Sequence, residues 1–369
     1  MYIKPPILIV AFALMLSCST NGSVVLLTDS KIVPFYVSQF NIENRANIIV
    51  KYKEYINTQI INKENAQIVI SKTIDNVDII KNFKNIQKYY YPDYPVLNKI
   101  SEKFTHRIIP LGFNFPILIH KNEYNIGKYI DAQKIKTMYK LFQREKKFFI
   151  SPYISENLFY IISRINKVNF NFLNKNPKYD EKKMLNITDH FKSFLDVNEL
   201  KFQKKFAEKY QYLKLENILL EKNTLLIAGL TDLSYYKGLN KEIRNKINFS
   251  YLTDQNKKLM ISNISFMGVQ ELSQATERFV IWILDKERQK KLIELKDRSK
   301  FNEHFGFVDG FTPYKSLNLQ LNFKKENPHP IFDENYIDQT LYIPNKKQTE
   351  KETQIVNELF LSSITKNPN

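Results

Sequence analysis

The sequence predicts an α/β fold. Short β-rich runs alternate with longer amphipathic segments from Val24 onward, which is typical of layered α/β proteins. Hydrophobic residues make up 43% of the chain and aromatic residues 14%, and this composition is sufficient for a globular core. The length of 369 residues allows one large domain or two of ordinary size. No fixed-period repeat and no Gly/Ser-rich or Pro-rich linker divides the sequence.

The composition also argues against several functional classes. The chain has 8 glycines, whereas average usage would give about 26, so a Gly-rich phosphate-binding loop is not expected. One cysteine cannot form an internal disulfide or a cysteine-based zinc cluster. The formal net charge of +17 would attract anionic partners. Codon bias is an alternative source of part of this charge, because isoleucine, lysine and asparagine are all used heavily.

The N-terminal segment has the pattern of an export signal. Lys4 precedes the apolar run 7–16, which is much shorter than the roughly 20 residues of a membrane-spanning helix. The only cysteine, Cys18, follows this run among small and polar residues. The segment resembles the lipobox of bacterial lipoproteins, whose cysteine is lipidated and becomes the first residue of the mature protein. Ser17 matches the lipobox pattern, whereas Met15 and Leu16 depart from it.

This resemblance implies a signal peptide over 1–17 and a lipidated tether over 18–23. We therefore expect an exported protein that its lipid holds to the cell membrane or outer envelope, either on the periplasmic face or at the cell surface. The alternatives are an ordinary signal peptide or a signal anchor with a chance cysteine. No second long apolar run follows, so the body is expected to be a soluble domain outside the cytoplasm.

The first half of the body predicts a series of strands with polar ends. Strands are expected over 24–27, 46–50, 66–70 and 107–120. Thr28, Asp29 and Ser30 are good N-cap residues, so they are expected to start a helix over 31–40 with Pro34 in its first turn.

The second half continues the alternation. A strand over 147–150 is expected to lead into a helix that starts at Ser151-Pro152, because serine is a good N-cap and proline suits the first helical position. Further expected elements are a strand over 223–229 ending in capping residues, a strand over 258–269, an amphipathic helical stretch over 271–295, and a polar tail with a short helix around 354–364.

The order of these features resembles the type 2 periplasmic solute-binding proteins of ABC transporters, the maltose-binding-like group, over about 24–319. Residues 110–122 are similar to the strand that crosses to the second lobe in that family. Residues 227–232 are similar to a strand end in the second lobe, and 275–289 to the helix after the return crossing. Residues 306–313 match the closing glycine-then-proline element loosely.

The resemblance implies a two-lobed clamp with a central mixed sheet in each lobe. Lobe one is expected over 24–116 plus 264–322, lobe two over 117–263, and the polar tail over 323–369. Such a clamp binds a small polar solute, a sugar or similar, between its lobes and delivers it to an ABC permease. The resemblance thus implies a binding protein and not an enzyme. Such a protein is expected to be a monomer and to hold no cofactor.

Candidate ligand-binding residues follow from the geometry of α/β sheets, in which ligands lie beyond the carboxyl ends of strands and beside helix N-termini. This rule selects Thr28, Asp29, Ser30, Ser71, Lys72, Thr73, Phe113, Asn114, Ser151, Tyr153, Ser155, Thr231 and Asp232. Most of them have an alternative role: helix capping for the serines, threonines and aspartates, surface solvation for Lys72, and core packing for Phe113.

No catalytic or metal motif is present. The five histidines lack His-x-x-x-His spacing, and Gly-x-Ser-x-Gly, Walker and His-Glu-x-x-His motifs are absent. We therefore predict neither an enzyme nor a metal site, and the export signal argues against nucleic acid as a partner. Trp282 has apolar neighbours at helical spacing, which predicts burial in the core. The tyrosine-rich segment 89–95 fits an interface anchor or chance packing.

Two further functions stay open. In the first, the same clamp is a surface interaction lipoprotein that binds anionic host or envelope polymers without transport, as the positive charge would allow. In the second, the protein is an exported hydrolase, although the sequence pairs no nucleophile with a base.

Overall fold

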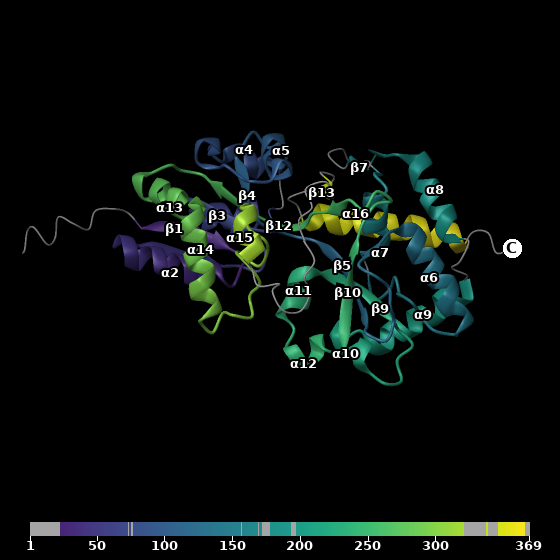
Figure 1. The fold of residues 1–369 in the computed structure, drawn as a ribbon. Coiled ribbons are helices and arrows are strands. Elements are labelled where there is room, and N and C mark those ends of the chain that lie inside the picture. The colour runs from purple at the N-terminus through teal and green to yellow at the C-terminus, as the bar shows by residue number, and fades with distance from the viewer. Residues whose placement is uncertain are drawn as a thin grey trace, which may run out of the picture.

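The computed structural model describes residues 23–72, 74, 77–155, 157–168, 170–171, 178–192, 197–320, 337–338 and 346–365. The predicted signal peptide, Cys18, nearly all of the tether, Thr73 and most of the residues between 321 and 345 lie outside the described residues. The described chain forms two α/β lobes that strands connect (Figure 1). No helix among the described residues is both long enough and apolar enough to cross a membrane.

The first lobe is built on a five-stranded mixed sheet with the order β2-β1-β3-β12-β4. Strand β1 is parallel to β2 and β3, whereas β12 is antiparallel to β3 and β4. The bounds are β1 (Val24–Thr28), β2 (Ile48–Tyr52), β3 (Ile68–Ser71), β4 (Ile108–Asn114) and β12 (Ser262–Val269).

Helices cover both faces of this sheet, as the near-continuous apolar strands require. Alternate strand residues point to opposite faces: Leu26 belongs to the core cluster that contains Tyr36 and Phe279, and Leu27 belongs to the cluster that contains Phe83. The helices are α2 (Val33–Asn44), α3 (Thr58–Lys63), α4 (Val77–Asn82), η1 (Gln87–Tyr89), α5 (Pro95–Lys103), α13 (Gln274–Leu284), α14 (Lys286–Asp297) and α15 (Lys315–Gln320).

The second lobe is built on a four-stranded sheet with the order β6-β10-β5-β9. Its strands are β5 (Pro116–Lys121), β6 (Tyr129–Ile130), β9 (Ala228–Asp232) and β10 (Ile247–Leu252). Its helices are α6 (Ala132–Arg144), α7 (Leu158–Ile165), α8 (Glu181–Lys192), α9 (Val197–Tyr210), α10 (Leu215–Leu220), α11 (Leu233–Gly238) and α12 (Lys241–Arg244). Two small sheets pair β7 (Phe170–Asn171) with β8 (Lys178–Tyr179), and β11 (Leu259–Met260) with β13 (Ile337–Asp338).

The chain crosses between the lobes at two adjacent places. Strand β4 ends at Asn114, and β5 begins two residues later in the other sheet. The return strand β12 begins at Ser262, which pairs with Asn114. The register of β12 against β4 shifts between Ser262 and Ser265, so the pairing of the two strands is irregular at this point.

The C-terminal helix α16 (Lys346–Thr365) packs against α7 and α8 of the second lobe (Figure 1). It is longer than the short helix that the sequence predicts, and it is not peripheral to the core. Val356 and Phe360 are fully buried, and the Phe360 ring stacks on Phe159 with centroids 4.4 Å apart. The apolar stripe at helical spacing explains this burial, because such a stripe must face a core.

Two expected helix starts are wrong, and one expected helical stretch is divided. Ser151 begins a turn rather than a helix, and α7 starts only at Leu158. Helix α2 has Ile32 at its N-cap and no side-chain cap, so Thr28, Asp29 and Ser30 do not cap it, although Pro34 does lie in its first turn. The stretch 271–295 is two helices, because Asp285 is extended and its carboxylate accepts a hydrogen bond from the Arg288 N–H at 2.7 Å to start α14.

Two expected strands are also shorter than predicted. Residues 147–150 form only a single bridge, from Phe148 to Leu226, and the strand expected over 223–229 begins at Ala228. Burial of Trp282 in the core is confirmed: its ring packs on Phe40 and Phe279, and its Nε1–H donates to Glu43 at 3.1 Å.

Candidate functional site

In the first lobe, three strands end at one edge of the sheet. Ser71 at the end of β3 pairs with Phe266, and Asn114 at the end of β4 pairs with Ser262. Ser262 is the first residue of β12, where the chain arrives from the second lobe, and Phe266 lies near the middle of this strand. Because β1 runs parallel to β3, Thr28 ends at the same edge. The described candidates of the first lobe, apart from Phe113, therefore lie at or just beyond the edge that faces the second lobe.

The loops after β1 and β3 are tied together through Asp29. The Ser71 hydroxyl donates to Asp29 Oδ2 at 2.6 Å, and the Lys72 backbone N–H donates to both carboxylate oxygens, at 3.0 and 3.1 Å. The Thr28 hydroxyl accepts from the Ser30 N–H at 3.1 Å. These polar side chains thus hold two adjacent strand ends in a fixed geometry.

A third loop joins this group through Asp309, which no strand-end pattern in the sequence indicates. Its Oδ2 accepts from the Ser30 hydroxyl at 2.9 Å, and its Oδ1 lies 2.6 Å from His304 Nδ1. Lys72 Nζ lies 3.9 Å from Asp309 Oδ2. Two carboxylates, an imidazole, an ammonium group and hydroxyls therefore gather at one sheet edge. The available sequence signal was an aspartate in a loop bounded by glycines, at 306 and 310.

The backbone of this third loop is strained. Val308 and Asp309 both have positive φ, 46° and 57°, which is a genuine outlier for a β-branched residue. The neighbouring Gly310 lies against β4, where a Cβ atom would be 2.5 Å from the Phe113 carbonyl oxygen. Such strain persists only where surrounding contacts determine it, and it clusters at functional sites.

Asp309 provides a pH-dependent prediction. Burial raises the pKa of the Asp309 carboxyl, but the hydrogen bond with His304 and the charge of Lys72 outweigh burial and leave this pKa below its usual value. A lowered folded-state pKa means that the ionised group stabilises the fold above the unfolded-state pKa of about 3.9. This stabilisation is lost as the pH falls through the folded-state pKa.

We expect the difference in unfolding free energy between the wild type and Asp309→Asn to shrink as the pH is lowered from about 5 to about 2. Urea unfolding of both proteins at a series of pH values measures this difference in unfolding free energy. A constant difference across this range would show that ionised Asp309 does not stabilise the loop.

In the second lobe, β9 and β10 end at the edge that faces the first lobe. Asp232 pairs with Pro116 and Tyr251 pairs with Ile117, the residues at which β5 enters this lobe. Asp232 caps α11 by accepting from the Tyr235 N–H at 2.9 Å, as the sequence predicts. It also accepts from Asn263 Nδ2 at 2.6 Å, and Asn114 Nδ2 lies 3.5 Å from its other oxygen. Asp232 therefore touches both crossing segments.

A cavity of about 580 Å³ lies in the second lobe beside this edge. Tyr153, Thr231 and Tyr235 line it on the side of the edge, and α9 and α10 line it on the other side. Burial raises the pKa of the Tyr153 hydroxyl, so this group stays neutral and can donate a hydrogen bond. The cavity combines aromatic surface with polar groups, and Lys204, Glu208 and Lys214 add charged side chains to its lining. Aromatic surface with a few polar or charged groups is typical of small-molecule sites.

Seven of the sequence candidates are buried. Four of them are at the strand ends described above: Thr28, Ser30, Ser71 and Asn114. The other three are not at these strand ends. Phe113 is fully buried against Tyr94 and Phe311, so it lies in the core rather than at the surface of the site. Ser151 and Ser155 are also buried: the Ser151 hydroxyl accepts from the Tyr153 N–H, and the Ser155 hydroxyl accepts from the Leu230 N–H at 2.9 Å. Ser155 holds the 151–155 turn against β9, and Ser151 stabilises the turn itself, so together they place Tyr153 at the cavity.

No group of three or more His, Cys, Asp and Glu side chains within the described ranges is arranged to hold a metal ion. The cluster around Asp309 contains one histidine and two carboxylates, but the hydroxyl, amide and imidazole groups described above already bind those carboxylates.

Comparison with known proteins shows the fold. No protein-family model matches the sequence, and no curated protein matches it. Among solved structures, a cyclic α-maltosyl-1,6-maltose binding protein from Arthrobacter globiformis is similar, with a TM-score of 0.62 and 10% identity over 93% of this chain and 94% of that one. An extracellular solute-binding protein of family 1 from Alicyclobacillus acidocaldarius has a TM-score of 0.57 and 14% identity over 94% of each chain.

A Bordetella ferric binding protein is also similar, with a TM-score of 0.55 and 11% identity over 91% of this chain and 98% of that one. These likenesses span nearly the whole chain and are structural rather than sequence matches. The chain therefore has the two-lobed α/β fold of the type 2 solute-binding proteins, as the order of its sequence features predicts.

Proposed function

We propose that this protein is a solute-binding lipoprotein that captures a small polar solute between its lobes and delivers it to an ABC importer. One observation carries the proposal. In each lobe, polar residues stand at the ends of strands, on the side of the sheet where the crossing strands leave for the other lobe. A ligand held there contacts both lobes, so its binding is coupled to their closure. The fold shared with solute-binding proteins supports the same role.

The chemistry of the two edges favours a polar solute such as a sugar. The first lobe presents Lys72 and the Asp309 cluster, and the second lobe presents the cavity with Tyr153, Thr231 and Tyr235. Sugar hydroxyls both donate and accept hydrogen bonds, so they match mixed polar groups. The apolar face of a sugar ring matches the tyrosine rings.

The test is thermal unfolding of the purified chain with a panel of sugars, oligosaccharides, amino acids, polyamines and ferric citrate. A solute at 100 times its Kd stabilises the folded state by about 2.7 kcal/mol, which raises the midpoint by several degrees. Tyr153→Ala is expected to reduce this shift in the unfolding midpoint. Tyr212→Ala is the matched control, because Tyr212 is 90% exposed and does not line the cavity. If no solute in the panel raises the midpoint, solute capture is the wrong function.

The proposed lipid anchor has its own test. We expect radiolabelled palmitate to label the protein in bacterial cells and the Cys18→Ser variant to remain unlabelled and leave the membrane fraction. Lipidation of the cysteine would supply two or more acyl chains, enough for stable attachment, whereas one chain binds only marginally. Equal labelling of both proteins would rule out Cys18 as the attachment site.

The net charge of +17 supports a second candidate, the interaction lipoprotein that binds anionic polymers without transport. Binding of heparin that weakens strongly between about 50 and about 500 mM salt, together with no response to any small solute, would favour it. Genes for two permease subunits and an ATPase beside this gene would favour the importer instead.

A further inference from the structure

The first lobe has a second sheet edge, on the side opposite the candidate solute site. Strand β1 begins there at Val24, which pairs with Ile48 at the start of β2. Strand β4 begins there as well, because Ile108 pairs with Gly268 near the end of β12. We call this edge, with the helix ends and loops beside it, the basal end. It faces away from the second lobe (Figure 1).

Cations without an ion-pair partner among the described residues gather at the basal end. Arg45 is the C-cap of α2 and precedes β2, and Lys103 is the last residue of α5 and precedes β4. The Lys84 N–H donates to the Val269 carbonyl at the end of β12, at 2.7 Å. Arg107 directly precedes β4 and is half-buried, whereas the other three cations are exposed. These side chains present positive charge to whatever lies against this end.

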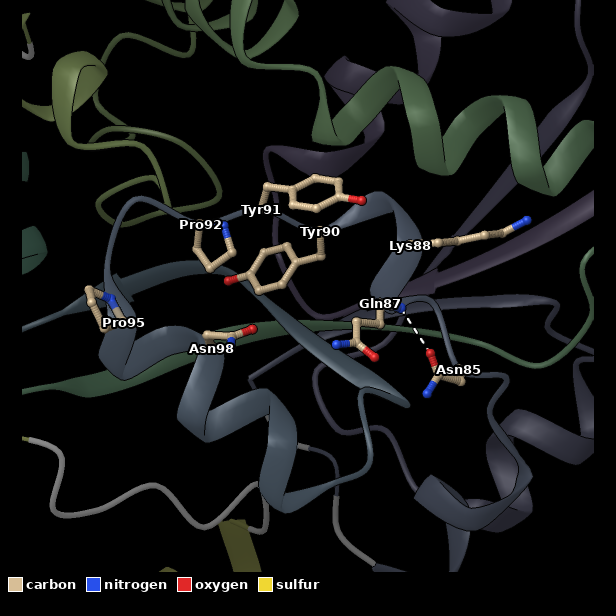
Figure 2. A pocket seen from close by; sticks show the side chains of 8 residues that line it. All are labelled: Asn85, Gln87, Lys88, Tyr90, Tyr91, Pro92, Pro95 and Asn98. Carbon is tan, nitrogen blue, oxygen red and sulfur yellow. Dashed lines mark hydrogen bonds between the residues drawn. The ribbon is translucent and has the colours of Figure 1, made fainter.

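The carboxylates nearby cancel little of this charge. Glu277 of α13 already pairs with Lys88 at 3.2 Å, and Figure 2 shows Lys88 extended away from the tyrosines of a neighbouring groove. Glu43 of α2 pairs with Arg288 at 2.6 Å and with Lys291 at 3.2 Å. Two exposed carboxylates outside these pairs also lie at the basal end, Glu102 and Glu271. Cations therefore outnumber carboxylates in this group.

An aliphatic side chain projects at the same end. The Asn41 side chain accepts from the Ile48 N–H at 3.0 Å and donates to the Ile48 carbonyl at 2.9 Å, so the last turn of α2 is fixed beside the start of β2. Ile42 in this turn is 73% exposed and lies three residues before Arg45. Exposed aliphatic groups beside cations suit a membrane interface, because the cations meet headgroup phosphates while the aliphatic group enters the acyl boundary.

The proposed lipid anchor brings a membrane to this end, and this step rests on the proposed function, in which Cys18 is lipidated. Cys18 and Val24 are six positions apart, and six residues span at most about 20 Å when fully extended. A lipidated Cys18 therefore keeps the basal end close to the bilayer. So short a linkage gives the headgroups a high effective concentration at the cations of this end.

We propose that the basal end of the first lobe binds the surface of an anionic lipid bilayer. Headgroup phosphates accept hydrogen bonds from the exposed lysines and arginine, and each such residue strengthens binding about fivefold. Ile42 enters the layer between headgroups and acyl chains. A soluble polyanion fits less well, because it gives Ile42 no apolar environment. The contact leaves the opposite edge, which carries Asp309, open to solutes.

The experiment uses the mature chain that the lipobox predicts, 18–369, with Cys18→Ser so that no lipid anchors it. Co-sedimentation measures its partition into phosphatidylcholine vesicles with and without about 30% phosphatidylglycerol, which supplies the negative surface charge. We expect partition into the anionic vesicles to be at least about tenfold stronger at about 100 mM NaCl. It should weaken at least about fivefold at about 500 mM NaCl, because salt screens the attraction.

Two double variants test the location. Lys84→Gln with Lys103→Gln is expected to weaken partition at least about tenfold. The matched control, Lys205→Gln with Lys222→Gln, removes the same charge from exposed lysines of the second lobe and is expected to weaken partition less than about threefold. Neither pair of changes breaks an ion pair between described residues, so both variants should keep the wild-type unfolding midpoint.

Ile42→Ser tests whether the partner is a bilayer. We expect this change to weaken partition into anionic vesicles about threefold or more, because the side chain no longer gains from leaving water. Binding of heparin, a polyanion without an apolar layer, should not change. The exposed position of Ile42 means that the fold should tolerate serine.

The proposal is overturned if anionic vesicles bind no better than neutral ones, or if the two double variants lose partition equally, since net charge alone would then explain binding. It is also overturned if Ile42→Ser partitions like the wild type, because any polyanion would then serve as the partner. The palmitate and solute tests use no vesicles, so these results leave the anchor and solute capture intact. A failed palmitate test would overturn the anchor alone.

Discussion

Phe113→Ala is expected to lower the free energy of unfolding by about 3–5 kcal/mol and to leave solute affinity unchanged in the molecules that remain folded. The side chain is fully buried and makes edge-to-face contacts with Tyr94 and Phe115, at centroid distances of 5.5 and 5.6 Å. Its backbone also exchanges two hydrogen bonds with Phe311, at 2.8 and 3.1 Å. Removing the ring therefore leaves a cavity at the point where β4 supports the strained 304–310 loop.

Urea unfolding measures the stability change, and Phe113→Leu is the matched control because it keeps most of the side-chain volume. We expect the leucine variant to lose distinctly less stability than the alanine variant. The opposite pattern, a large loss of solute affinity with little change in stability, would mean that Phe113 contacts the ligand after all.

Asp232→Ala is expected to cost about 2 kcal/mol of stability and to loosen the crossing between the lobes. The carboxylate caps α11, and removal of an N-cap costs about 1 kcal/mol. It also accepts from Asn263 Nδ2 at 2.6 Å in the return strand, and hydrogen bonds to charged groups contribute more than neutral ones. Amide hydrogen exchange in 262–265 should become at least about tenfold faster, because local opening then costs less free energy.

Asp232→Ser separates the two roles of this side chain. Serine is a good N-cap but is too short to maintain the contact with Asn263, so we expect about 1 kcal/mol of stability to return while exchange in 262–265 stays fast. If both variants exchange at the wild-type rate, Asp232 caps the helix and does not link the lobes.

Local patterns predicted the first sheet well. The runs 24–27 and 66–70 correspond to β1 and β3, and most of the run 258–269 corresponds to β12, because apolar strands that are buried on both faces are distinctive in any context. The apolar stripe around Trp282 likewise predicted a buried helix face, which α13 confirms. The capping role of Asp232 depends on neighbouring backbone N–H groups, so it too is visible in the sequence.

Local patterns failed where a distant segment competes for the same groups. Ser151-Pro152 has the residues of a helix start, but the chain forms a turn there, and Ser155 binds the Leu230 N–H of β9 instead. The 346–365 segment is polar on average, yet Val356 and Phe360 complete the core of the second lobe. In both cases the deciding contact is made with a residue more than 70 positions away.

The sequence by itself determined the α/β class, the order of most strands and the polar character of the strand ends. These properties depend on side-chain alternation and capping, which act over a few residues. Only the tertiary structure brought His304 and Asp309 to Ser30 and Lys72, and joined Asp232 to both crossing segments. Sheet register and loop closure decide these contacts, because both join residues that are far apart along the chain and leave no local signal in it.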